Sequence, residues 1–153
     1  MKICQANSAP LIALARALFA EYADGLGIDL SFQGFAEELT GLPGLYAAPQ
    51  GRLLLALAGS AAAGCVALRP LHDGICEMKR LFVSPRFRGQ GIGLQLAERI
   101  VEEARAIGYP RMRLDTLPSM HSAIRLYAAL GFSPCAAYYE TPLPDTVFME
   151  LPL

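Results

Sequence analysis

A glycine-rich segment, Arg88-Gly89-Gln90-Gly91-Ile92-Gly93, separates a strand-like run from a helix-like run near the middle of the sequence. The run before it covers residues 77–83, and the run after it extends to residue 107. Closely spaced glycines let the backbone approach a ligand, and the first turn of a helix has N–H groups without partners. Arg88 adds a fixed positive charge with a planar donor group that suits phosphate. The order of strand, loop and helix therefore predicts a site for a phosphorylated ligand.

The spacing of these glycines does not fit two common nucleotide-binding loops. A dinucleotide-binding loop needs G-x-G-x-x-G, but the third position here is Leu94 or Leu96, although Asp115 lies about where its ribose-binding acid would be sought. A P-loop needs a lysine followed by serine or threonine after its second glycine, and the segment has neither. The pattern that fits is Arg-x-x-Gly-x-Gly, which begins five residues after Val83.

Charge and composition exclude several classes of partner. The 153 residues carry a net charge of -1, which gives no electrostatic footprint for nucleic acid or anionic lipid. Basic residues cluster only locally, at residues 79–88 and 111–113, which suits a small anionic ligand. With 54% hydrophobic residues, the sequence predicts one domain over residues 1–153 with one sizeable core.

We expect a cytoplasmic protein that binds no metal and has no membrane segment. The first residues lack the apolar region of a signal peptide, and no apolar run reaches the ~20 residues of a membrane span. The four cysteines are scattered, without a CxxC pair, and are interpreted as reduced core residues.

Periodicity and turn residues predict a mixed α/β (α+β) fold, with a mostly antiparallel sheet of about seven strands and about four helices. The predicted strands cover residues 2–5, 52–57, 62–69, 75–83, 111–115, 135–140 and 146–151. The predicted helices begin near Pro10, Phe35, Ile92 and Ser119, and residues 24–33 are predicted to be a loop.

Two sequence blocks resemble the GNAT superfamily of acyl-CoA-dependent N-acetyltransferases. The first is EMKRLFVSP followed by RFRGQGIG, at residues 77–93, and the second is AIRLYAALGF, at residues 123–132. Their separation and the order of predicted elements are also similar to that family along nearly the whole chain. The resemblance implies that Arg88, Gly89, Gln90, Gly91, Ile92 and Gly93 bind the pyrophosphate of acetyl-CoA. It also implies that the backbone of Leu81, Phe82 and Val83 pairs with the pantetheine arm as an added strand would.

Attack of an amine on a thioester needs a neutral nitrogen, a donor for the developing oxyanion and an acid for the leaving thiolate. Glu77 occupies the position of a base in many GNAT enzymes, although a surface carboxylate paired with Lys79 or an arginine is the alternative. The backbone N–H of Leu81, in a splayed or bulged strand, is expected to bind the oxyanion. Tyr127 matches the tyrosine that protonates the sulfur in this family, and packing against the sheet is its alternative role.

Some positions depart from the family pattern. Met120 stands where an asparagine often binds the pantetheine arm, and its thioether is expected only to pack. His121 or Ser122, or a backbone group, would have to replace that bond. We assign no catalytic role to His72 or His121, and Cys76 is predicted to pack in the core rather than carry an acyl group.

The function implied is transfer of an acetyl group from acetyl-CoA to a primary amine of a small molecule or peptide, by direct attack in a ternary complex. A non-catalytic acyl-CoA-binding regulatory module is the alternative, and transfer of a longer acyl group is a weaker one. By the family's pattern, residues 22–35 and 137–147 wall the acceptor side. Asp29, Glu37 and Glu38 would attract a cationic amine there, but acidic residues on short helices usually face solvent, and Tyr138 and Tyr139 are candidates to line a pocket. Many GNAT enzymes form homodimers, but the sequence indicates no interface.

Overall fold

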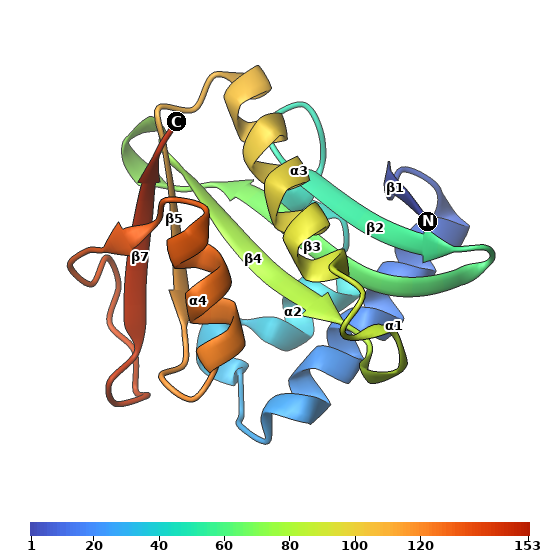
Figure 1. Cartoon of the computed structure of the whole chain (residues 1–153), viewed down its shortest axis with the longest axis horizontal. Helices are drawn as coiled ribbons and strands as arrows, with labels where there is room; N and C mark the ends of the chain where they lie inside the picture. The colour runs from blue at the N-terminus through green and yellow to red at the C-terminus, as the bar shows by residue number, and fades with distance from the viewer.

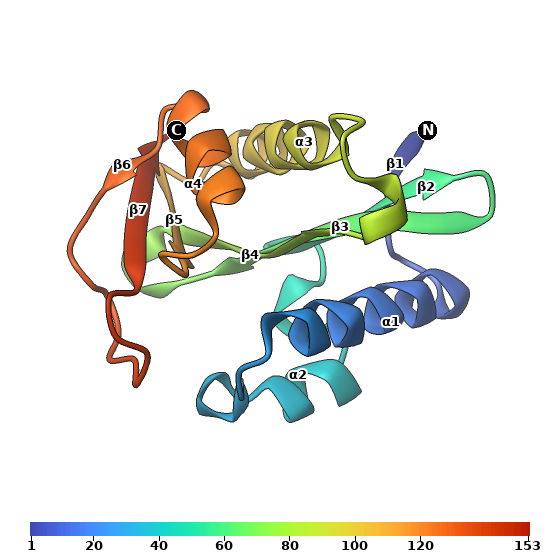
Figure 2. The same cartoon turned by 60° about the horizontal axis from the view of Figure 1, so that its bottom comes forward.

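The strand β2 (Arg52–Ala58) has apolar residues on both of its faces. Leu53 and Leu55 belong to one buried cluster, while Leu54 and Ala56 belong to another. A strand that is apolar on both faces needs a cover on both sides of its sheet. In the computed structural model, which describes residues 1–153, helices cover both faces, with α3 and α4 on one side and α1 and α2 on the other (Figures 1 and 2).

The seven strands form one sheet in the order β1-β2-β3-β4-β5-β7-β6. All neighbouring strands are antiparallel except β4 and β5, which are parallel. Besides β2, the strands are β1 (Lys2–Gln5), β3 (Ala61–Pro70), β4 (Cys76–Val83), β5 (Arg111–Thr116), β6 (Ser133–Pro134) and β7 (Val147–Pro152). The predicted mixed, mostly antiparallel sheet of seven strands with four helices is confirmed.

The helices cover the sheet with their apolar faces. They are α1 (Ala9–Leu26), α2 (Phe35–Thr40), α3 (Ile92–Ile107) and α4 (His121–Ala129). Leu96 and Ile100 of α3 are fully buried against β2, β3 and β4, and Leu18 and Phe19 of α1 are buried on the opposite face. None of these helices combines the length and the apolar character that crossing a membrane requires.

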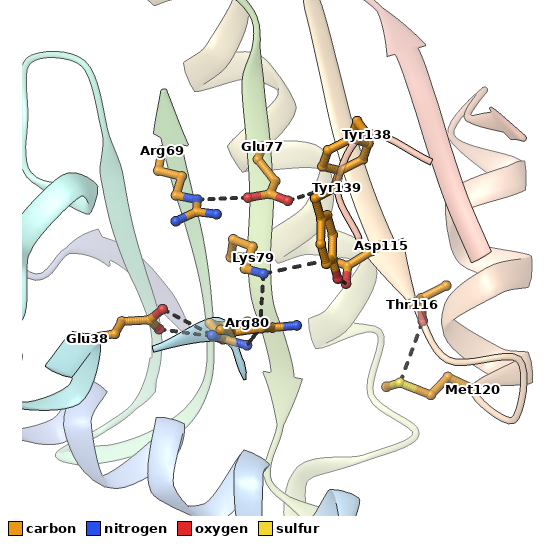
Figure 3. A network of polar contacts seen from close by, with 11 residues as sticks. Glu38, Arg69, Glu77, Lys79, Arg80, Asp115, Thr116, Met120, Tyr138 and Tyr139 are labelled. Carbon is orange, nitrogen blue, oxygen red and sulfur yellow. Dashed lines mark hydrogen bonds and ion pairs between the residues drawn. The ribbon is translucent and has the colours of Figure 1, made fainter. Parts of the chain in front are cut away.

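The predicted strand at Cys135–Glu140 is wrong, because β6 covers only Ser133–Pro134 and, after one more hydrogen bond from the Cys135 N–H to Phe148, the segment is irregular. Successive side chains of a strand point to opposite faces of the sheet. Tyr138 and Tyr139 instead both turn toward the sheet centre, where their hydroxyls donate to Glu77 and Asp115 (Figure 3). The irregular backbone is what lets two adjacent tyrosines reach the same site.

The predicted loop at Asp24–Gln33 is also partly helical. The first helix continues to Leu26 and ends at Gly27, whose left-handed backbone (φ 66°) stops it. Residues Ser31–Gln33 then form a 3-10 turn, η1, before α2 begins. Gly25 does not end the helix because a glycine in a helix costs only about 1 kcal/mol relative to alanine.

Candidate active site

The parallel strands β4 and β5 separate soon after they meet. They pair only at Cys76 with Met112 and at Glu77 with Arg113, and then diverge (Figure 1). A pocket fills the space between the diverging strands, lined by β4 at 78–81, by β5 and its following turn at 114–117, and by Tyr127 of α4. We call this pocket the interstrand cleft. Tyr22 and Leu26 of α1 line it as well, so residues from helices on both faces of the sheet reach one site.

A bulge in β4 sets which side chains face this cleft. The pairing with β3 passes from Ala67–Lys79 directly to Cys65–Phe82, so Arg80 and Leu81 together oppose one residue. Arg80 has a left-handed backbone (φ 61°), which is uncommon for a side chain of its size. The extra residue places Lys79 and Arg80 on the same face and turns Leu81 to the opposite one. The expectation of a bulged strand next to Leu81 is confirmed, whereas the role of the Leu81 N–H stays a prediction.

Arg80 is held in this conformation by the surrounding side chains. Its guanidinium donates two hydrogen bonds to Glu38 of α2, at 2.9 and 3.0 Å, and a third to Gln33 at 2.9 Å. The ring of Phe35 lies 5.1 Å from the guanidinium carbon. Glu38 therefore does not face solvent as an acidic residue on a short helix usually does, whereas Asp29 and Glu37 are exposed. The three acidic residues do not form a common patch for a cationic amine.

The glycine loop is exposed and leads into an uncapped helix. Gly89 and Gly91 have left-handed backbones (φ 79° and 76°), a conformation that favours glycine. No side chain caps the first turn of α3, where Gly91 is the N-cap residue. The start of α3 therefore has partnerless N–H groups and the positive end of a helix dipole at one place, as the predicted anion site requires.

Arg88 is anchored to the end of β4. Its Nε donates to the carbonyl oxygen of Val83 at 3.0 Å, and its guanidinium carbon lies 5.8 Å from the centre of the Phe82 ring. The side chain uses no other nitrogen in a hydrogen bond, so its two Nη groups are available beside the loop. The loop and the strand end predicted to hold acetyl-CoA are thus brought together.

Tyr127 reaches the cleft from the opposite face of the sheet to Lys79 and Arg80. Its side chain is buried, packs edge-on against Phe132 and lines the cleft. Burial raises the pKa of the Tyr127 phenol well above its usual range, so the hydroxyl is protonated at neutral pH. Tyr127 thus packs as its alternative interpretation expected and also lines the cleft, whereas its role as the acid stays a prediction.

Met120 also lines the cleft and does more than pack. The hydroxyl of Thr116 donates to its sulfur at 3.6 Å, so the expectation of packing alone is wrong (Figure 3). The reason is that Thr116 ends β5 four residues before Met120, the N-cap residue of α4, which brings the hydroxyl and the thioether together. His72 and His121 are exposed, and Cys76 is buried in the core, where burial raises the pKa of its thiol to about 12.

Glu77 is a fully buried carboxylate of a central strand, not the surface residue that its alternative interpretation assumed. Its side chain is 1% exposed. One oxygen accepts from Arg69 Nε at 2.8 Å, and the other accepts from the Tyr138 hydroxyl at 2.6 Å (Figure 3). Burial, and next the charge of Glu77, raise the pKa of Tyr138. The predicted pairing with an arginine is present, but in the interior.

Asp115 is a second carboxylate that the sequence did not point to as a catalytic residue. It lines the interstrand cleft, accepts a short hydrogen bond from Tyr139 and lies 3.7 Å from the ammonium group of Lys79. Burial lowers the pKa of Lys79, and the nearby charges of Glu77 and Asp115 act in the opposite direction. The sequence signal that could have placed Asp115 in the site is the alternation in β5. It buries Met112, Leu114 and Thr116 on one face and leaves Asp115 on the other.

Comparisons with known proteins match this architecture. Residues 15–132 match the acetyltransferase (GNAT) family. An uncharacterized N-acetyltransferase of Schizosaccharomyces pombe is 40% identical over 136 residues, which are 88% of this chain and 83% of that protein. The crystal structure of an acetyltransferase from Streptococcus agalactiae has a TM-score of 0.80 at 22% identity and covers 99% of this chain and 98% of its own. A GNAT family acetyltransferase from Elizabethkingia anophelis with acetyl-CoA bound has a TM-score of 0.58 at 24% identity, with 68% and 77% covered.

Proposed function

The chain belongs to the GNAT acetyltransferase family, and on this basis we propose that it transfers the acetyl group of acetyl-CoA to a primary amine by direct attack in a ternary complex. The observation that carries the proposal is the interstrand cleft, which brings β4 as far as Leu81 together with Tyr127. The same strand continues beyond the cleft to Val83 and the glycine loop, which suits a phosphorylated donor, while Tyr127 offers a proton donor in the cleft.

We assign the diphosphate of the donor to the glycine loop. The uncapped N–H groups at the start of α3 and the free Nη groups of Arg88 are donors that a diphosphate needs. The pantetheine arm would then follow residues 81–83, where β4 has left its parallel neighbour and its backbone can pair with an added strand. The acetyl-CoA bound to the Elizabethkingia anophelis relative supports the same donor here.

We propose that the backbone N–H of Leu81 stabilises the charge that develops on the thioester oxygen, because the bulge at Arg80 shifts this residue out of regular pairing. Tyr127 would protonate the leaving sulfur. Its phenol is neutral at physiological pH and lines the same cleft. A positioned proton donor of this kind contributes ~10²- to 10⁴-fold to a rate.

Removal of the ammonium proton is assigned to Glu77. Each of its oxygens accepts one hydrogen bond and has a second lone pair, so the carboxylate can still receive a proton. Glu77→Gln should lower kcat/KM by ~10²-fold, and the loss should shrink as pH rises toward the pKa of the amine. Asp115→Asn is the matched variant, because it removes the other carboxylate of the network. A larger loss in Asp115→Asn, with the same pH trend, would transfer the role to Asp115.

The proposal is tested by calorimetry with acetyl-CoA, followed by thiol release with a panel of primary amines. Binding of acetyl-CoA and amine-dependent release of CoA are expected. Mass spectrometry after incubation with acetyl-CoA alone should find no acetylated protein, because direct attack involves no acyl-enzyme. Absence of acetyl-CoA binding at millimolar concentration would refute the proposed function, and a stoichiometric acetyl-enzyme would refute direct attack.

A further inference from the structure

A second pocket adjoins the interstrand cleft on the side of α2. It has a volume of about 250 Å³, and its polar lining includes Gln33, Glu38, Arg69, Glu77, Lys79 and Arg80. Gln33, Lys79 and Arg80 line both pockets, so they form the boundary between them. We call the second pocket the basic pocket. A molecule in the basic pocket can place one end at the boundary with the interstrand cleft.

Both carboxylates of the basic pocket already accept hydrogen bonds from arginine side chains. Glu38 accepts two hydrogen bonds from Arg80, and Glu77 accepts from Arg69 and Tyr138 (Figure 3). The lining thus contains three basic side chains and two carboxylates. A polycationic acceptor would find no carboxylate in this lining that is not already paired with an arginine.

Arg69 has unused donors in this pocket. Only its Nε makes a hydrogen bond, to Glu77, and its side chain is 31% exposed. Both Nη groups are without protein partners, and Figure 3 shows the guanidinium next to Glu77 and above Lys79. Because Glu77 fixes the orientation of the guanidinium, its remaining edge is preorganised for an anionic group. Lys79 donates a hydrogen bond to Gln33 at 3.2 Å and lies 3.7 Å from Asp115, so its ammonium group still has an N–H group for a ligand.

From this arrangement we propose that the acceptor is a small amine that carries a carboxylate, such as a free amino acid, and that Arg69 binds the carboxylate with Lys79 as a second donor. The inference rests on the proposed function and names the substrate class of the same site. The carboxylate would lie in the basic pocket and the amine at the boundary, facing the interstrand cleft. The pocket volume fits one small molecule.

The test compares each of the twenty standard amino acids with its own carboxamide, with spermidine as a polycation, by thiol release in the presence of acetyl-CoA. The accepted amino acids should have kcat/KM ~10-fold or more above their carboxamides, because a charge-assisted pair with arginine is lost in the amide. Arg69→Gln should raise KM for the acid by ~10-fold or more and leave KM for the amide nearly unchanged, so that the acid-to-amide preference disappears.

Two further variants separate binding from folding. Arg69→Lys keeps a cation for Glu77 but loses the planar donor edge, and it should show the same loss of preference to a smaller degree. Arg52→Gln is the control, since Arg52 is 20% exposed and paired with Glu103 but lines neither pocket. Its acid-to-amide ratio should equal that of the wild type.

Three outcomes overturn the inference while leaving the donor site in place. The first is equal use of amides, spermidine and acids by the wild type, and the second is an Arg69→Gln effect that is the same for acid and amide. The third is release of CoA with none of the carboxylated amines, while calorimetry still detects acetyl-CoA binding. Failure of acetyl-CoA binding itself would instead refute the donor site.

Discussion

Arg80 shows how one residue fixes the geometry of the site. Its left-handed backbone creates the bulge, and its guanidinium connects that bulge to Glu38 of α2. The side chain is 2% exposed, so the ion pair with Glu38 is shielded from solvent. The strain of the backbone is therefore balanced by contacts made across the sheet face.

Replacing Arg80 should separate the contribution of its ion pair with Glu38 from the cost of its strained backbone. Arg80→Ala removes the pair and keeps the strained backbone, and should lower the free energy of unfolding by ~3 kcal/mol, because Glu38 loses its partner in a partly buried place. Arg80→Gly should be less destabilising than Arg80→Ala by ~1 kcal/mol, because glycine adopts the left-handed conformation without strain. Urea unfolding of the variants measures both differences.

Arg99→Ala is the control, since Arg99 is 45% exposed in its pair with Glu103. This substitution should lower the free energy of unfolding by less than ~0.5 kcal/mol. If Arg80→Gly were as destabilising as Arg80→Ala or more so, the strain interpretation would be wrong.

Tyr127 carries a second prediction at this scale. Tyr127→Phe should lower kcat by ~10²-fold and leave acetyl-CoA affinity nearly unchanged, because only the proton donor is lost. Since burial raises the phenol pKa, wild-type kcat should not decline through loss of this proton below pH ~10. Stopped assays from pH 7 to 10 measure kcat of the wild type and the variant, and calorimetry with CoA measures their affinity. An equal loss of affinity and turnover would leave Tyr127 only a packing role.

At the scale of elements, the glycine loop and the start of α3 act together with the end of β4. Arg88 connects them through its hydrogen bond to Val83, so the loop is positioned by the strand that ends before it. These parts are close in sequence, and that is why the sequence alone could predict them. The bounds of α3, β4 and β5 were likewise readable from their apolar periodicity.

Arg88→Ala should weaken CoA binding by ~1.5 to 3 kcal/mol, the contribution of a hydrogen bond to a charged group. Stability should change little because Arg88 is exposed. Calorimetry with CoA gives the affinity, and Arg105→Ala, in the last turn of the same helix, is the matched control. A CoA affinity equal to that of Arg105→Ala would place the diphosphate away from this loop.

The acceptor-side elements could not be predicted in the same way. Tyr138 was expected in a strand, but its partner Glu77 is 61 residues away in sequence, and no local pattern indicates that contact. The hydrogen bonds between Glu38 and Arg80 and between Tyr139 and Asp115 are likewise long-range. The interior position of Glu77 was missed because a single carboxylate in a strand has no sequence signal for its neighbours.

For the whole molecule, buried tyrosines predict a loss of stability at alkaline pH. Burial raises the pKa of Tyr22, Tyr46 and Tyr127 in the folded state. The unfolded chain releases these protons near pH 10, whereas the folded chain retains them. Their contribution is therefore complete below pH ~10 and declines above it, by ~1.4 kcal/mol per pH unit for each phenol.

Lys79 changes the stability with pH in the opposite direction to the tyrosines, because its pKa is lowered on folding. Its contribution rises with pH up to the unfolded value near 10.4 and is constant above it, so it does not offset the later decline. Urea unfolding at pH 8, 10 and 11 measures the trend. Tyr46→Phe should reduce the alkaline slope without lowering stability at pH 8, because its buried hydroxyl has no partner. A free energy of unfolding that stays constant from pH 9 to 11 would contradict the assignment.

The short contact between β4 and β5 has a consequence for how this enzyme can change over evolutionary time. Two residue pairs join the strands, and beyond them the donor side is built from one continuous stretch, 81–93, while the acceptor side is assembled from distant segments. Substitutions among the distant segments can therefore alter which amine is accepted without touching the stretch that is proposed to hold acetyl-CoA. On this proposal the donor and acceptor specificities can change nearly independently, and the boundary residues Gln33, Lys79 and Arg80, which line both pockets, are where they remain linked.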